Sequence, residues 1–121
     1  MTVTITAPRE TRANERRVAV VPAVVPKLEK LGVEIRLQEG AGAAARIPDE
    51  SYHNAGVHVG QLELDKADVV LCVQVPSPSE VRKMPKGSIL IAFVYAHREP
   101  ETVEALVERE ITRFAMDLVP R

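Results

Sequence analysis

Short runs of β-branched and other apolar residues recur along the chain, and stretches with helical spacing lie between them. The run at residues 69–73 is almost unbroken, which is typical of a central strand buried on both faces. Strands that alternate with helices form βαβ units, so the predicted class is α/β, with three layers: a mostly parallel sheet with helices on both faces. The apolar runs predict strands at residues 3–6, 33–37, 57–59, 69–73, 88–94 and 111–116.

The apolar spacing also predicts the helices between these strands. Val24, Val25, Leu28 and Leu31 lie at helical spacing in a segment that ends at Gly32. Proline inside a helix removes a backbone donor, so we expect a frayed or kinked start, with Pro26 in the first turn. Further helices are predicted at residues 49–56, at 77–84 with Ser77 or Ser79 as the cap, and at 99–109.

Composition narrows the function classes. The 121 residues are 45% hydrophobic, which predicts one soluble domain, and 16 basic residues nearly balance 17 acidic ones. No excess positive field is available to attract nucleic acid, and no apolar run reaches the roughly 18 residues needed to cross a bilayer. We therefore expect no nucleic-acid partner and no direct membrane insertion. A single cysteine fits a reducing compartment, so the expected location is cytoplasmic.

A glycine motif follows the second predicted strand. Gly40 to Ala45 satisfies G-x-G-x-x-G/A, and Glu63 and Asp65 lie about twenty residues later, as in dinucleotide loops. Such a loop needs a helix amino end directed at the pyrophosphate, yet Pro48 would end that helix after about one turn. A plain glycine turn is favoured, and a dinucleotide loop remains the alternative.

The histidines and the cysteine predict no reactive centre. His53, His58 and His97 share no metal-ligand spacing, so no metal site is expected. Cys72 lies inside the apolar run, where a thiolate is costly, and is predicted to be a core residue rather than a nucleophile.

The densest charge in the chain is RETRANERR, residues 9–17, directly after the first predicted strand. Loops at the carboxyl ends of strands line the ligand cleft in open α/β sheets, and arginine there can clamp a carboxylate or phosphate. A solvated loop without specific contacts is the other interpretation.

The segment PRETRANERRVAVVP, residues 8–22, resembles the opening signature P-x-E-x-x-x-x-E-x-R-V-A-x-x-P of the alanine dehydrogenase and transhydrogenase alpha-subunit superfamily. GVEIRLQEGAG, SYHNAGV, VLCVQVP and the closing AMDLVPR also follow the family's order, so the resemblance covers essentially the whole chain. It implies that residues 1–121 are a single amino-terminal domain, Rossmann-like or flavodoxin-like. The family's NAD-binding Rossmann domain is expected to be absent from this chain.

Three positions compare the two branches of the family. Alanine dehydrogenases hold pyruvate with an arginine, a lysine and a histidine; this chain has Arg17, Gln74 and Tyr95 at the matching positions. Without the ammonium and imidazole groups, protonation of an imine intermediate has no obvious agent. The chain thus resembles the transhydrogenase branch, although Cys72 stands where both branches often have lysine.

The resemblance implies a function that also needs other domains. In the family, the NAD-binding alpha subunit transfers hydride between NADH and NADP, coupled to proton passage through a membrane subunit, and it works by positioning two nicotinamides rather than by catalytic side chains. The implied cofactor is NAD, in the complete subunit. Arg121 is the implied cofactor contact, and Arg17, Gln74 and Tyr95 are implied cleft-lining residues.

The implied partners are the rest of the alpha subunit, the membrane-embedded and NADP-binding subunits, and a second alpha subunit in a homodimer. The parent complex would place the chain on the cytoplasmic side, peripheral to the inner membrane. The chain alone is expected to be inactive. Two alternatives remain: a fragment of an alanine dehydrogenase-like amino-acid dehydrogenase, or a standalone, non-catalytic binding module.

Overall fold

A computed structural model describes residues 2–119. Within them the chain forms one sheet of six strands, and every neighbouring pair is parallel. The order across the sheet is β3-β2-β1-β4-β5-β6, so the chain builds outward from β1 in one direction and then from β4 in the other. The strands are β1 (Val3–Ala7), β2 (Val33–Gln38), β3 (His58–Gly60), β4 (Val69–Gln74), β5 (Ile89–Phe93) and β6 (Thr112–Ala115). The predicted α/β class is confirmed.

Four α-helices connect the strands of the described chain: α1 (Val25–Glu29), α2 (Asp49–Asn54), α3 (Pro78–Arg82) and α4 (Pro100–Glu108). Five 3₁₀ turns accompany them: η1 (Pro22–Val24), η2 (Ala43–Ala45), η3 (Leu64–Lys66), η4 (Ala96–Arg98) and η5 (Met116–Leu118). Each helix and strand overlaps a predicted one within a few residues, and the 3₁₀ turns are the addition that the spacing did not predict.

Two proline and serine predictions are confirmed at helix starts. Pro26 lies in the first turn of α1, behind the 3₁₀ turn that Pro22 opens, so the helix begins irregularly as expected. Ser77 caps α3 with a full capping box: its Oγ accepts from the Glu80 backbone N–H, and the Glu80 carboxylate accepts from the Ser77 N–H.

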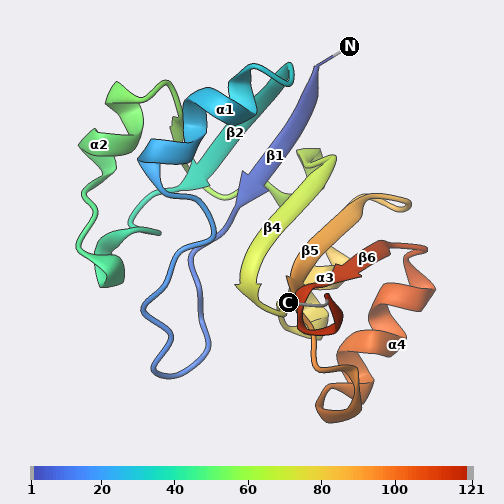
Figure 1. Ribbon diagram of the computed structural model, residues 1–121. Coiled ribbons are helices and arrows are strands. Elements are labelled where there is room, and N and C mark those ends of the chain that lie inside the picture. Colours follow the sequence, from blue (N-terminus) through green and yellow to red (C-terminus); the bar gives the residue numbers. More distant parts are fainter. Residues whose placement is uncertain (1, 120–121) are drawn as a thin grey trace.

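The helices cover opposite faces in the two halves of the sheet. Ala7, Ile35 and Leu37 bury one face of β1 and β2 with α1 and α2, whereas Val70 and Leu90 bury the other face of β4 and β5 with α3 and α4. In Figure 1, α1 and α2 lie on the near side of the sheet and α3 on the far side. This alternation follows from right-handed crossovers that run in opposite directions from the centre.

Each half of the sheet consequently has one face without a helix among residues 2–119. On β1 and β2 that face carries the polar Thr6, Arg36 and Gln38, whereas on β5 and β6 it carries Ile91 and Phe114, the latter 55% exposed. No helix formed by residues 2–119 has the length and apolar character needed to cross a membrane.

Candidate functional site at the carboxyl edge of the sheet

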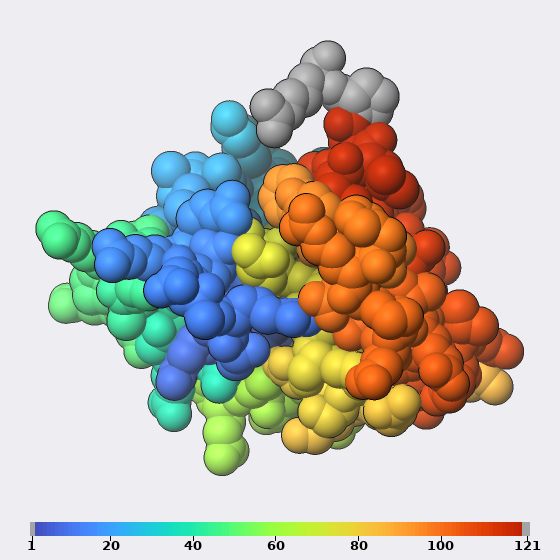
Figure 2. Space-filling model, turned by 90° about the horizontal axis from the view of Figure 1, so that it is seen from below, coloured from blue at the N-terminus to red at the C-terminus, as the bar shows by residue number. Residues whose placement is uncertain are grey.

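The carboxyl ends of β1 and β4 lie side by side at the point where the strand order reverses. Open α/β sheets bind ligands in the crevice outside such a switch point, because the loops leave it in opposite directions. The charged segment of residues 9–17 follows β1 and therefore lies here. Figure 2 views this edge end-on, with the blue loop against the yellow and orange segments that follow β4 and β5.

Glu10 fastens the loop to the end of β4. Its Oε2 accepts from the Val73 N–H and its Oε1 from the Gln74 N–H, each at 2.9 Å. The register of β4 against β5 shifts between Leu71 and Gln74, and the Glu10 carboxylate satisfies amides at that irregularity. Burial raises the pKa of Glu10 above its ordinary 4.5, although the two backbone N–H groups act against the rise.

Glu15 joins Arg17 to Gln74. Its Oε1 accepts from Arg17 Nη2 at 2.8 Å and from Gln74 Nε2 at 2.9 Å. Its Oε2 accepts from the Arg17 backbone N–H at 2.9 Å and from Arg17 Nε at 3.0 Å. The Glu15 side chain is only 5% exposed, while that of Arg17 is 64% exposed. The Arg17 hydrogen bonds lower the pKa of Glu15 to about 2, so this carboxylate stays ionised through the physiological range.

Arg12 extends the connections to the next strand. Its Nε donates to the Val75 carbonyl at 3.2 Å, and its Nη1 lies 3.0 Å from Glu99 Oε1, just before α4. One side chain thus links the loop after β1 with the segments after β4 and β5. The three loops at this edge are held as one unit.

Tyr95 lies beyond the end of β5 in a left-handed backbone conformation, with φ 46° and ψ 58°. Its ring stacks on Phe93 with centroids 6.2 Å apart, and the Arg98 guanidinium lies 5.2 Å from the centre of the Tyr95 ring. Asp117, in η5, accepts from the Val94 N–H at 2.8 Å. A non-glycine residue in this region costs about 1–2 kcal/mol, and these contacts hold it there.

The structure places the predicted cleft residues at one edge. Arg17 and Gln74 share the Glu15 carboxylate, and the charge of Tyr95 contributes to a raised Arg17 pKa, whose main cause is its hydrogen bond to Glu15. Arg121, the predicted cofactor contact, lies outside the described residues.

Sequence reasoning missed the residues that organise this edge: Glu10, Glu15 and Arg12. The signal was present in RETRANERR, because an arginine beside a cleft needs a counter-charge and two glutamates stand in the same segment. The pairing itself depends on Gln74, 59 residues from Glu15, and no local pattern shows it.

The glycine motif forms a closed turn, as favoured from the sequence. The Gly40 N–H donates to both Asp49 carboxylate oxygens, at 3.0 and 3.2 Å. A Cβ on Gly42 would lie 2.7 Å from the Ile47 carbonyl and 2.8 Å from the Tyr52 ring, so this glycine is required by the chain's own packing. The turn continues into a 3₁₀ turn rather than an α-helix. The pyrophosphate of a dinucleotide does not fit here, since the space and a helix amino end are both missing.

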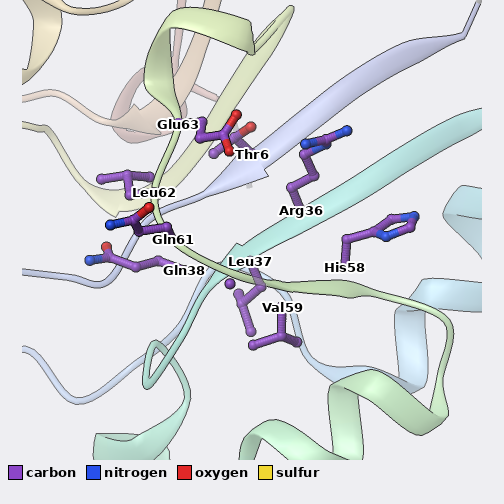
Figure 3. A pocket seen from close by; sticks show the side chains of 10 residues that line it. Thr6, Arg36, Leu37, Gln38, His58, Val59, Gln61, Leu62 and Glu63 are labelled. Atoms are coloured by element: carbon purple, nitrogen blue, oxygen red, sulfur yellow. The ribbon is translucent and has the colours of Figure 1, made fainter.

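A separate cavity of about 150 Å³ lies on the helix-free face of β1–β3. In Figure 3, Thr6, Arg36 and Glu63 lie on one side of the strands, while Leu37 and Val59 point to the other. Its charges are paired internally: Arg36 Nη2 lies 3.1 Å from Glu34 and Lys66 Nζ 2.7 Å from Glu63. The Thr6 hydroxyl is buried without a hydrogen-bond partner in the described structure. This cavity contains none of the predicted site residues.

Cys72 is 7% exposed and belongs to the core with α3 and α4, which confirms the prediction. Burial raises the pKa of its thiol, so it is not a nucleophile at neutral pH. Residues 2–119 contain no cluster of three or more His, Cys, Asp or Glu side chains placed to hold a metal ion.

Comparison with known proteins identifies the family. The family model described as "Alanine dehydrogenase/PNT, N-terminal domain" matches residues 6–121. The chain is 39% identical to an NAD(P) transhydrogenase subunit alpha polypeptide of Rhodospirillum rubrum, over 97% of this chain and 33% of that protein.

Two solved structures agree with this match. The transhydrogenase from Sinorhizobium meliloti aligns with a TM-score of 0.92 and 36% identity, over 98% of this chain and 36% of that one. An L-alanine dehydrogenase aligns with a TM-score of 0.86 and 28% identity, over 93% of this chain and 32% of that one. The chain spans about a third of the length of each of these proteins.

Proposed function

Because the chain belongs to the family of alanine dehydrogenase/PNT amino-terminal domains, we propose that it forms one wall of the NAD(H) cleft in the alpha subunit of a proton-translocating NAD(P) transhydrogenase. The parent protein would transfer hydride between NADH and NADP⁺. The relatives are about three times as long as the matched segment, so the second wall would come from sequence beyond this domain.

One observation carries the choice of branch: Gln74 occupies the end of β4 and is bound to Glu15 beside Arg17. Alanine dehydrogenases resemble this chain but have a lysine at this position and a histidine at that of Tyr95. An amide neither titrates nor supplies a proton, so this edge lacks the acid needed to protonate an imine. Transhydrogenation between two nicotinamides needs no such acid.

The residues of this edge orient rather than react. Glu10 and Arg12 lock the loop after β1 to the ends of β4 and β5, and Glu15 fixes the directions of the Arg17 and Gln74 side chains. A nicotinamide dinucleotide bound in the complete subunit supplies the hydride. Because the glycine turn leaves no room for the pyrophosphate, this wall would contact a portion of the cofactor other than its phosphates.

The remaining features of the proposal follow from this role. The chain would act as a single domain without its own nucleotide site and would be inactive alone. Its partners would be the rest of the alpha subunit, a second alpha subunit, and the membrane-embedded and NADP-binding subunits. It would therefore be located on the cytoplasmic side, peripheral to the inner membrane, with Arg121 reaching the cofactor.

A chimera tests the proposal. This chain replaces the matching third of the Rhodospirillum rubrum polypeptide, and NADH binding and hydride transfer to NADP⁺ are measured after mixing with the other subunits. We expect the chimera to bind NADH and to support transfer, and the isolated chain to show no tight NADH binding by calorimetry.

A folded chimera that does not bind NADH contradicts the proposal, as does tight binding by the isolated chain. Assay of the chimera with pyruvate, ammonia and NADH tests the alternative. Reductive amination without transhydrogenation would favour the alanine dehydrogenase branch.

A further inference from the structure

The hydrogen bonds around Glu15 leave a defined set of donors and acceptors facing outward. Glu15 uses both oxygens on Arg17 and Gln74. Arg17 Nη1 makes no hydrogen bond within residues 2–119, and its side chain is 64% exposed. Because Gln74 Nε2 is held by Glu15, the orientation of its amide is fixed, and Gln74 Oε1 has no donor in the described chain. The pair therefore presents guanidinium N–H donors beside one amide acceptor.

The charge at this pair is balanced. The Arg17 guanidinium lies 2.8 Å from the Glu15 carboxylate, and the Glu10 carboxylate lies behind Gln74 on its backbone N–H. Other cations at this edge are engaged elsewhere: Arg9 donates to the Glu39 carbonyl, and Arg98 lies over the Tyr95 ring. A carboxylate would gain little Coulomb attraction here, and its oxygens would face the Gln74 oxygen.

We propose that Arg17 and Gln74, oriented by Glu15, form a receptor for an uncharged primary carboxamide, the group carried by a nicotinamide ring, in preference to a carboxylate. The carboxamide oxygen accepts from Arg17 and its NH₂ donates to Gln74 Oε1. Ala43 and Ala44 border the adjoining groove of about 380 Å³, which Arg17 and Glu15 also line, and supply an apolar wall for the ring. The proposal rests on the proposed function only for the identity of this ring.

The test compares nicotinamide with nicotinate, which have the same ring and differ in the charged group. The ¹⁵N-labelled chain is titrated with each compound, while the side-chain amide of Gln74 and the Nε–H of Arg17 are followed by NMR. Nicotinamide should shift both signals with a dissociation constant about tenfold lower than that of nicotinate. The Gln61 amide, which follows β3 at the far side of the sheet, should not move.

Two variants sharpen the result. Gln74→Lys adds a cation and removes the acceptor, so it should reverse the preference toward nicotinate. Glu15→Gln should weaken nicotinamide binding by releasing both side chains, with the fold checked by the backbone spectrum. Equal or stronger shifts with nicotinate in the unchanged chain, or no shift at Gln74 with either compound, overturn the proposal. Neither outcome decides whether the chimera transfers hydride, so the two proposals can fail separately.

Discussion

Two loops leave neighbouring strands at the same edge of the sheet, and they differ in what holds them. The loop after β1 is held by side chains that reach across to β4 and beyond: Glu10, Arg12 and Glu15. The glycine turn after β2 is held by its own neighbours, with Gly42 packed against Ile47 and Tyr52 and Gly40 bound to Asp49. By sequence the glycine turn looks more like a ligand loop, yet it has no space for one.

The difference separates a motif's letters from its environment. A glycine serves a ligand only where the missing side chain leaves room for that ligand; at Gly42 the room is filled by protein atoms. The charged loop, in contrast, keeps Arg17 at the surface while its counter-charge is buried beneath it. Substitutions in the two loops should therefore have different consequences for stability and for pH dependence.

The largest effect is expected from Gly42→Val. Its Cβ would lie under 3 Å from the Ile47 carbonyl and the Tyr52 ring, so we expect a loss of about 3 kcal/mol in the free energy of unfolding, measured by denaturant titration. The matched control is Gly60→Ala, where a Cβ meets nothing within 4 Å and the loss should stay within about 1 kcal/mol. A stable Gly42→Val protein would mean that the turn is open, and the contrast between the loops would fail.

Glu15→Gln should have an intermediate effect that depends on pH. The folded-state pKa of Glu15, about 2, lies below its ordinary value of 4.5, so its stabilisation is fully present above pH 4.5 and declines as the pH falls toward 2. At neutral pH we expect a loss of about 1–2 kcal/mol, less than the pKa difference implies because Arg17 is exposed.

The measurement is denaturant unfolding from pH 7 to pH 2. The variant should lose part of the acid destabilisation below pH 4.5, whereas Glu101→Gln, at an exposed position on α4, should follow the unchanged protein. If Glu15→Gln and the unchanged protein show the same pH profile, the Glu15 cluster does not form in solution.

The smallest effect is expected from Arg12→Ala. The change removes the Val75 hydrogen bond and the partly exposed ion pair with Glu99, which together contribute about 1 kcal/mol. Raising the salt concentration should reduce the difference, because the ion pair is screened. Arg16→Ala, an exposed arginine in the same loop, should change stability by no more than about 0.5 kcal/mol. Equal effects of the two variants would show that Arg12 does not link the three loops.

The amino-acid sequence by itself determined the strands, the helices and the α/β class. The apolar run of β4, the proline at the start of α1 and the Ser77 cap each act over a few residues, so their outcome can be predicted locally. Arg17, Gln74 and Tyr95 could be nominated as a cleft because they follow strands whose carboxyl ends share an edge.

Only the tertiary structure decided how that edge is organised. The hydrogen bonds from Val73 and Gln74 to Glu10 and Glu15 join residues 59 to 64 positions apart, and they exist because β4 pairs with β1 in one particular register. The closed glycine turn likewise depends on Tyr52 packing from α2. Such contacts depend on the positions of whole elements relative to one another, which local apolar spacing does not encode.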